Sequence, residues 1–417
     1  MASLHVPPSL RHRQFFLLWL GLTISVAGTQ MQTWALLWHV REITDKPIAL
    51  GGIGAARILP IFVFSLVAGA LADVVDRRRM MFITQSVMAA VALVLGWLTL
   101  RGTISLWHIY LLTAIQAVAS AFDLPARQAL VPNLVPTSDL PNAFSLMSIA
   151  SQTGSIVGPA LSGLAIAYFG LASVYVINAA TYLAVLLALV LMGRVAQQMA
   201  AARRHPVSLS AIAEGVQFIV SHPIILSTMV MDFFATFFSS ANTLMPIVAR
   251  DVLKVGAVAY GWLSAAQSVG AMLAALFISQ LDGIRRQGLV FLGAVTFFGA
   301  STIAFGLAPS VAVAFVALMF IGGSDSVSTI IRNTIRQLQT PDYIRGRMTS
   351  VNQIFFMGGP QLGEIEAGAV AQLFSAPFAI VSGGIGCLVA VFLIVRKWPV
   401  LLAFNGDEPA VAGSPAD

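Results

Sequence analysis

Five ionisable side chains stand inside long apolar stretches of this 417-residue chain. They are Arg57, Asp232, Asp325, Glu364 and Glu366. Placing a charge in hydrocarbon is costly unless it is paired or faces a water-filled cavity, so such residues mark ion and substrate pathways. A carboxyl group that is protonated in one conformation and released in another can carry protons, and an arginine can bind an anion or neutralise an acid.

The four acids are therefore candidates for proton coupling, and some of these residues have a structural alternative. Asp325 could equally stabilise helix packing, because Arg332 follows seven residues later on nearly the same side of a helix. Glu364 and Glu366 project about 200° apart on a helix. We expect Glu364 to face a cavity and Glu366 to lie at a glycine-lined packing surface. Arg57 is either a counter-charge for an acid or an anionic substrate, or a snorkelling or helix-pairing residue.

Other polar side chains in the apolar stretches could line a substrate cavity. Thr228, Asp232, Thr236, Ser239 and Thr243 fall on one face of a helix over residues 223–249, a pattern typical of a cavity wall. The alternative is a seam of hydrogen bonds between helices. Further residues are candidates for substrate contact, and for Gln30, Trp34 and Gln116 the alternative is a hydrogen bond between helices. These candidates are Gln30, Trp34, Gln116, Gln353 and Gln361, together with Arg57.

The elements that position these residues follow from composition. The chain is 58% hydrophobic and only 10% charged, against about a quarter charged in soluble domains, which excludes an ordinary soluble enzyme. A membrane-spanning helix needs about 20 apolar residues. Apolar runs predict an all-α membrane protein with twelve transmembrane helices. The expected spans are 15–38, 48–72, 80–100, 105–127, 141–167, 171–193, 223–249, 258–281, 287–307, 311–333, 346–372 and 375–396.

The charged residues predict the topology. Most of the 23 Lys and Arg residues fall on the cytoplasmic side when both termini are placed inside the cell, so the basic character is no sign of nucleic-acid binding. We expect an N-terminal six-helix bundle over 1–200 and a C-terminal one over 223–400. Residues 201–222 form a cytoplasmic linker with an amphipathic helix, and 401–417 a disordered cytoplasmic tail.

The two expected bundles carry traces of a duplication. Shifting the sequence against itself by 205 residues aligns identical residues in one continuous register, as expected for two parallel six-helix repeats. The matches are Arg127 with Arg332, Pro136 with Pro341, Ser145 with Ser350, Gly154 with Gly359, Gly158 with Gly363 and Gly163 with Gly368.

A conspicuous motif, GALADVVDRRR, covers Gly69 to Arg79 at the end of the second span. A small residue lets helices approach closely, Asp73 can meet a helix N-terminus or an arginine, and Arg77 and Arg78 anchor the turn inside. This motif resembles the signature of the major facilitator superfamily, and the degenerate copy SQLDGIRRQG, with Asp282, stands between spans eight and nine. The resemblance implies the two-bundle fold of that superfamily and a gating role for these residues.

Three further segments narrow the resemblance. They are DLPARQALVPNLVP from Asp123, GSIVGPALSG from Gly154, and RNTIRQLQTPDYIRGRMTSVNQIF leading into QLGEIEAG from Arg332 to Gly368. Together they resemble the bacterial exporter group that includes enterobactin-type siderophore exporters. The resemblance implies secondary active export of a small siderophore-like metabolite, by proton antiport with alternating access. A broad-specificity drug:proton antiporter is the alternative.

In that group the run with Gly154, Gly158, Pro159 and Gly163 is the antiporter motif of span five; physically, it allows tight helix packing, and we expect the same of Gly359 and Gly363. One feature departs from the drug antiporter pattern. Thr113 stands before Gln116 where those proteins often carry an intramembrane arginine, so proton coupling through that arginine is unsupported.

The remaining expectations concern the gate, partners and location. Asp123 and Arg127 are four residues apart and should pair at the cytoplasmic gate, with Arg332 as the repeat counterpart of Arg127. We expect a multi-pass protein of the bacterial inner membrane that functions as a monomer. Its partners are a small-molecule substrate, protons and the lipid bilayer, with no nucleic acid, cofactor, metal or enzymatic activity. A non-transporting sensor or assembly protein is a remote alternative.

Overall fold

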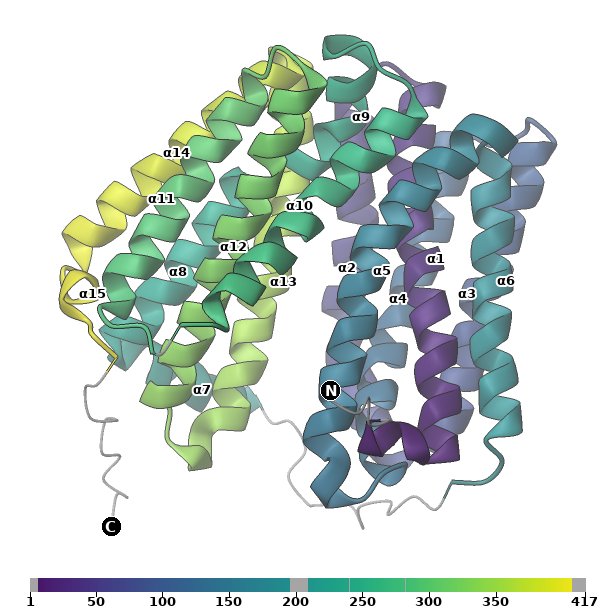
Figure 1. Ribbon diagram of the computed structural model, residues 1–417, viewed down its shortest axis with the longest axis horizontal. Coiled ribbons are helices and arrows are strands. Elements are labelled where there is room, and N and C mark those ends of the chain that lie inside the picture. Colours follow the sequence, from purple (N-terminus) through teal and green to yellow (C-terminus); the bar gives the residue numbers. More distant parts are fainter. Residues whose placement is uncertain (1–6, 196–208, 240, 282, 407–417) are drawn as a thin grey trace, which may run out of the picture. The chain divides into compact units, whose positions relative to one another are not determined.

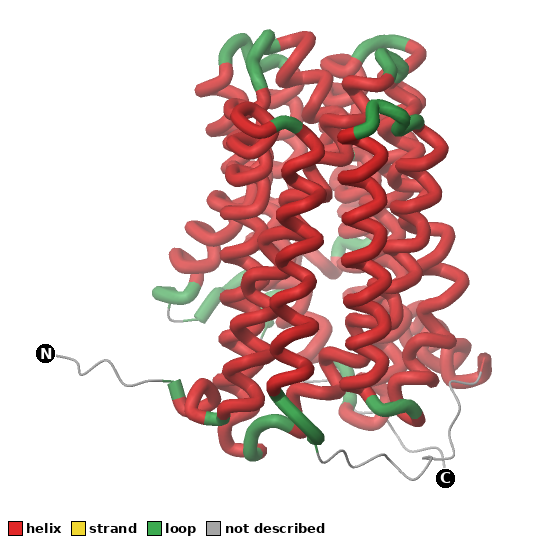
Figure 2. The backbone as a smooth tube through the Cα atoms, turned by 90° about the vertical axis from the view of Figure 1, so that its right-hand side faces the viewer, coloured by secondary structure: helices red, strands yellow, loops and turns green. Residues whose placement is uncertain are grey.

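The computed structural model describes residues 7–195, 209–239, 241–281 and 283–406. Within these ranges the chain is helical and contains no β-strand (Figure 2). Short loops join the long helices, which Figure 1 labels. They are α1 (Arg13–Ile43), α2 (Pro47–Val74), α3 (Arg77–Leu100), α4 (Leu106–Leu130), α5 (Leu140–Phe169), α6 (Leu171–Leu191), α8 (Pro223–Phe238), α10 (Ala257–Ile278), α11 (Gln287–Gly306), α12 (Val311–Gln339), α13 (Asp342–Leu373) and α14 (Ala376–Lys397).

The twelve expected spans all correspond to helices, so the predicted all-α membrane fold is confirmed. In the described part of the chain, ten helical segments are long and apolar enough to cross a membrane. The other two spans are α5 and α13, which occupy equivalent places in the repeat. Some spans follow each other almost directly. Gly170, with φ of 79°, ends α5 and lets α6 begin at the next residue, because glycine adopts left-handed backbone angles without strain.

Span seven is interrupted, contrary to the expectation of one helix over 223–249. Helix α8 ends at Phe238, and the chain continues through the 3-10 helix η4 (Ala241–Leu244), the short α9 (Met245–Ile247) and a π-helical turn over Val248–Val252. Pro246 lies in the first turn of α9, where its missing N–H leaves no helical hydrogen bond unmade. Thr243 therefore does not continue the helical face that carries Thr228 and Asp232.

The chain forms two compact units. Unit 1 comprises Met1–Asp45, Ala56–Pro206 and Gly256–Ala265; unit 2 comprises Lys46–Ala55, Val207–Val255 and Ala266–Asp417. The start of α2 thus belongs with the second half of the sequence, and the start of α10 with the first half. The domain boundaries expected from the sequence, at residues 200 and 223, do not predict that these helix starts pack with the opposite half.

Glycines allow the exchanged segments to pack. In unit 2, a Cβ atom on Gly51 or Gly54 of α2 would lie 2.9 Å from the carbonyl oxygen of Glu364 or Gln361 of α13. In unit 1, a Cβ atom on Gly163 of α5 would lie 2.9 Å from the Cα atom of Gly261 in α10. Backbones approach this closely only where side chains are absent, as is common between membrane helices.

Within unit 1, α1 packs against α5 and α6, and α3 packs against α4 and α6. Gly154 and Gly158 bring α5 onto α1, because Cβ atoms there would lie 2.6 Å from Val26 and 2.5 Å from Gln30. Pro159 is buried beside them. At one end, Phe15, Leu18 and their neighbours form an apolar core with residues of α3, α4, α5 and α6. The span-five glycines therefore serve the predicted helix packing.

Within unit 2, the linker helix α7 (Leu209–Ser221) packs against α8 and α13. Phe218 and Ile219 form a core with Met229 and Met348. Val220, an apolar residue of the same helix, is exposed. The described part of the apolar face is therefore centred on Phe218 and Ile219, and it packs on protein helices.

The expectation of a disordered tail from residue 401 onward is wrong for the first residues of that range. A short helix, α15 (Val400–Ala403), packs on α11 and α8. Leu401 and Phe404 are buried, and the Gly288 N–H donates to the Phe404 carbonyl at 3.0 Å. These two apolar side chains explain the docking. The expected tail over 407–417 lies outside the described residues.

The duplication register holds for later helices of the two halves. Helix α6 begins at Leu171 and α14 at Ala376, which is the same shift of 205 residues that aligns the sequence motifs. Helices α4 and α12 begin at Leu106 and Val311 in that register. These helices therefore support the repeat inferred from sequence. Helices α1, α2 and α3 begin 210 residues before α8, α10 and α11, so the shift of 205 compares residues only from α4 onward.

The α1–α5 contact predicts a specific sensitivity to side-chain volume. Gly158→Val should lower the free energy of unfolding in detergent by about 1–3 kcal/mol, because the new side chain overpacks the contact with Gln30. Gly293→Val is the matched control, since a Cβ atom at Gly293 meets nothing within 4 Å. Denaturant unfolding of the two purified variants measures the difference. Equal stability would contradict the proposed packing.

Candidate functional site

A buried ion pair connects α8 to α12 in unit 2. Arg332 Nη1 and Asp232 Oδ1 are in direct contact, and their side chains are only 3% and 5% exposed. The neighbouring hydroxyl of Thr228 is occupied by its own helix, because it donates to the Ile225 carbonyl at 2.8 Å. Asp232, predicted as a proton carrier, and Arg332, predicted at a gate, thus form one site.

A second buried arginine lies one helical turn beyond this pair. Arg336 Nε donates to the Arg332 carbonyl at 3.2 Å, and Arg336 Nη2 donates to the Asn333 side chain. Arg336 is 7% exposed and forms no ion pair with a described residue. Two guanidinium groups, those of Arg332 and Arg336, therefore lie near the carboxylate of Asp232.

Asp325 lies on α12, two turns before Arg332, and is half-buried. It forms no hydrogen bond or ion pair with the residues that the structure describes. The described contacts therefore do not support the alternative that Asp325 stabilises helix packing through a polar partner. Asp325 remains a candidate for proton coupling.

The two glutamates of α13 are half-buried and lie in different surroundings. A Cβ atom on Gly54 would lie 2.9 Å from Glu364 Oε2, so Glu364 packs along the first turns of α2. Gly359, on the helical side of Glu366, packs against Phe233 and Thr236 of α8. The sequence placed only Glu366 at a glycine-lined packing surface, and in the structure Glu364 lies at one as well.

Unit 1 holds an uncharged polar network instead of an ion pair. Gln32 of α1 donates to Gln116 of α4 at 2.5 Å and accepts from Asn178 of α6 at 2.7 Å. Gln116 in turn donates to the Tyr182 hydroxyl at 3.4 Å, which is also 3.0 Å from the Thr29 hydroxyl. Gln32 and Asn178 are completely buried. The network holds three helices together and satisfies their polar groups.

Two other candidates for substrate contact in unit 1 make structural contacts. Gln30 Nε2 donates to the Ser155 hydroxyl of α5 at 3.1 Å. The Trp34 carbonyl accepts from the Tyr260 hydroxyl at 2.8 Å, and the Tyr260 ring packs on Trp34 and Trp38. Arg57 is half-buried in α2, and its side chain forms no hydrogen bond or ion pair with a described residue.

In unit 2 the remaining cavity candidates lie on α8 and α13. The Thr236 hydroxyl donates to the Asp232 carbonyl at 2.8 Å, within its own helix. Ser239 is half-buried at the end of α8. Gln361 Oε1 is buried without a hydrogen-bond partner among the described residues. The side chain of Gln353 lies outside the described part of the structure.

The expected gate residues of unit 1 bind the ends of α3, α4 and α6 together. Arg77 Nη1 donates to Asn133 Oδ1 at 2.8 Å, and Arg78 Nε donates to the Leu189 carbonyl at 2.7 Å. Asp123 is buried and accepts from the side chains of Thr84 and Gln85 at 2.8 and 2.9 Å.

The expected pair of Asp123 with Arg127 is present but long, with 3.9 Å between Arg127 Nε and Asp123 Oδ2. Of Gly69 and Asp73 the structure describes only the helical backbone, and Asp282 lies outside the described residues. Among the described residues, no group of three or more His, Cys, Asp or Glu side chains could hold a metal ion.

Comparison with known proteins decides the family. The model of the transmembrane secretion effector family matches residues 5–405. The chain belongs to this family of the major facilitator superfamily. Curated relatives include the enterobactin exporter EntS of Escherichia coli (strain SE11) and that of Shigella boydii serotype 18, each 26% identical over 403 residues, covering 97% of this chain and 96% of the relative.

Solved structures show the same fold. A bacterial homologue of the human lysosomal transporter Spinster, in an inward-facing and unoccupied conformation, matches with a TM-score of 0.70 and 15% identity, over 96% of this chain and 97% of that one. The nucleoside transporter NupG matches with a TM-score of 0.68 and 14% identity, over 92% and 98%. This secretion effector family member is a multi-pass bacterial inner-membrane transporter of the exporter type, and not an enzyme.

Sequence reasoning missed several members of these clusters. Asn178 and Tyr182 were not singled out, although a buried Asn in an otherwise apolar span is the signal that an interhelical network leaves in a sequence. Tyr260 lies near the start of α10, and its sequence context gives no comparable sign of an interhelical contact. The contact between Asp232 and Arg332 joins residues a hundred positions apart, and no local spacing encodes it.

The ion pair predicts strongly coupled mutations. Asp232→Asn and Arg332→Gln should each lower the free energy of unfolding by about 3–5 kcal/mol, because each leaves a buried charge without its partner. The double variant Asp232→Asn/Arg332→Gln should regain most of that loss. Denaturant unfolding of the four proteins in detergent gives the interaction energy. Simple addition of the two single losses would show that the pair does not contribute as described.

Proposed function

We propose that this protein exports a small amphipathic metabolite by proton antiport, and that Asp232 is the group that binds the transported proton. The observation that carries the proposal is the buried contact between Asp232 and Arg332. The direction of export follows from the family, and the proton coupling and the substrate are our inference.

Protonation of Asp232 has a large energetic consequence at this site. A neutral Asp232 would remove the negative charge of the ion pair from beside a buried guanidinium, and breaking a buried pair in this way costs about 3–5 kcal/mol. The protein can relieve that cost by moving α8 relative to α12, or by admitting water to the arginine. Binding of a proton thereby favours a different arrangement of unit 2, which is what coupling of a gradient to transport requires.

The same pair restricts the charge of the substrate. In an antiporter the substrate must bind better when Asp232 is ionised, because substrate and proton then compete. A cation or a hydrogen-bond donor fulfils this condition. An anion that took Arg332 away from Asp232 would make the carboxyl group easier to protonate, and it would travel with a proton. Antiport at Asp232 therefore favours neutral donors and cations over anions.

An iron-free catecholate siderophore satisfies this restriction. Phenolic hydroxyls have a pKa of about 10, so they are neutral hydrogen-bond donors at physiological pH. The similarity to enterobactin exporters over almost the whole chain supports this substrate class. Arg57, which would suit an anionic substrate, has no role in this scheme other than helix pairing or contact with the membrane interface.

A broad-specificity drug:proton antiporter is the second candidate, and a cluster of aromatic rings favours it. Phe233, Phe234, Phe237 and Phe238 follow Asp232 on α8, with neighbouring ring centroids 5.1 to 6.1 Å apart. Such rings can pack against many flat apolar molecules. A cationic aromatic drug would also meet the charge restriction set by Asp232.

The proposal also includes the orientation of the chain in the membrane. The distribution of basic residues supports a topology with both termini in the cytoplasm. In this orientation Arg77, Arg78 and Arg127 lie near the cytoplasmic surface, where their bonds within unit 1 hold a gate region together. We propose that a single copy of the chain is the transporting unit.

Uptake into everted membrane vesicles tests the coupling. An acidic lumen should drive accumulation of an iron-free tricatecholate siderophore, and nigericin, which collapses the pH gradient, should abolish it. The Asp232→Asn/Arg332→Gln variant should lose gradient-driven accumulation and retain exchange of labelled for unlabelled substrate. Asp325→Asn is the matched control and should remain coupled. Uncoupling by Asp325→Asn alone would assign the proton to Asp325, and accumulation of ethidium but not of the siderophore would favour the drug antiporter.

A further inference from the structure

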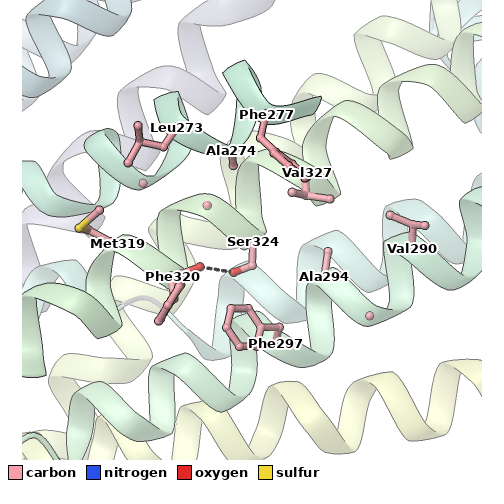
Figure 3. Close-up of a pocket in the computed structure, with 13 residues that line it drawn as sticks. Leu273, Ala274, Phe277, Val290, Ala294, Phe297, Met319, Phe320, Ser324 and Val327 are labelled. Carbon is pink, nitrogen blue, oxygen red and sulfur yellow. Dashed lines mark hydrogen bonds between the residues drawn. The ribbon is translucent and has the colours of Figure 1, made fainter. Parts of the chain in front are cut away.

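Three helices of unit 2 enclose an apolar pocket that the transport proposal does not use. It has a volume of about 570 Å³ and lies among α10, α11 and α12 (Figure 3). Leu273 and Phe277 contribute from α10, Phe297 from α11, and Phe320 from α12. Phe297 and Phe320 meet edge to face, with ring centroids 5.3 Å apart. The volume is within the range of small-molecule sites.

The lining of this pocket excludes a polar ligand. Ser324 is the one lining residue with a polar side chain. Its hydroxyl donates to the Phe320 carbonyl at 2.6 Å, as the dashed line in Figure 3 shows. The hydroxyl is thus bonded within its own helix. An occupant gains apolar contact here and no charged or polar recognition.

The pocket opens onto the outer surface of membrane-spanning helices. Leu273, Phe277, Phe297 and Phe320 all line it and are also exposed, with Phe277 as much as 68% exposed. Exposed apolar side chains on a membrane-spanning helix face hydrocarbon. Space at Gly293 deepens the pocket, because a Cβ atom there would meet nothing within 4 Å. The pocket is therefore continuous with the bilayer and accessible to a lipid chain.

One end of the pocket adjoins two arginines. Val290 lines the pocket, and its N–H donates to the Arg286 carbonyl at 3.1 Å, so Arg286 lies one turn from the lining. Arg285 and Arg286 are exposed in the loop between α10 and α11, and neither pairs with a residue that the structure describes. Exposed basic residues at the cytoplasmic membrane surface attract anionic lipid headgroups by about 1 kcal/mol each.

We propose that this pocket binds an anionic phospholipid of the cytoplasmic leaflet. One acyl chain occupies the space among α10, α11 and α12, and the phosphate lies beside Arg285 and Arg286. The apolar lining, the opening toward hydrocarbon and the basic loop at one end each match one part of that molecule. The site is separate from Asp232 and Arg332, and the proposal does not depend on which substrate the protein exports.

Native mass spectrometry of the protein released from nanodiscs tests the proposal. With equal amounts of phosphatidylglycerol and phosphatidylethanolamine, the wild-type protein should retain phosphatidylglycerol preferentially. Gly293→Leu, which fills the pocket, should lose the retained lipid. Arg285→Gln/Arg286→Gln should lower the preference for phosphatidylglycerol about fivefold for each arginine removed, since about 1 kcal/mol corresponds to that factor.

Two matched variants control for general effects. Ala90→Leu introduces the same side chain at an exposed position of α3, and Arg396→Gln/Lys397→Gln removes two basic residues at the end of α14. Both should retain lipid as the wild type does. Unchanged retention in Gly293→Leu, or equal retention of the two lipids by the wild type, would overturn the proposal. The proposal would also be overturned if Gly293→Leu dissociated a dimer. The same holds if this variant abolished substrate binding while lipid stayed bound.

Discussion

The contact between Asp232 and Arg332 is the constraint on which the described chemistry of unit 2 depends. Two charges removed from water are tolerable only while they stay together, and separating them is costly. The contact thus fixes α8 against α12 as long as Asp232 is ionised. A proton removes the reason for that fixed arrangement. A single protonation event at one carboxylate can in this way alter the packing of two membrane helices.

The duplication clarifies how such a site can arise. In the repeat register Arg332 corresponds to Arg127, whereas Ser328 occupies the place of Asp123. Unit 1 keeps its carboxylate on the same helix as its arginine, where Thr84 and Gln85 also bind it. Unit 2 has replaced that carboxylate and receives Asp232 from α8. The retained arginine connects two helices in the second unit instead of two residues of one helix.

The same register shows that the two units differ in the polarity of their interiors. In the register of 205 residues, Gln116 and Asn178 correspond to Ile321 and Gly383. Unit 1 joins α1, α4 and α6 by neutral hydrogen bonds that do not titrate near physiological pH. Unit 1 also buries the carboxylate of Asp123 near Arg127. The two units therefore differ in that only the described ion pair of unit 2, Asp232 with Arg332, joins two of these membrane-spanning helices.

Sequence alone was sufficient for the number of helices, because hydrocarbon demands long apolar segments whose ends are marked by Gly, Pro and charge. It also identified the glycines at Gly154 and Gly158, since small residues at regular spacing have few other uses in a membrane helix. It could not place the partner of Asp232, because the contact with Arg332 is between distant segments. The break after Phe238 and the docking of Leu401 likewise depend on tertiary packing, which local patterns do not encode.

Proton release on substrate binding tests the central claim most directly. Purified protein in weakly buffered detergent, with a pH-sensitive dye, should release protons into the medium when an iron-free tricatecholate siderophore is added. The Asp232→Asn/Arg332→Gln variant should bind the siderophore without that release. Proton uptake by the wild-type protein, or the same release from the double variant, would contradict competition between substrate and proton at Asp232.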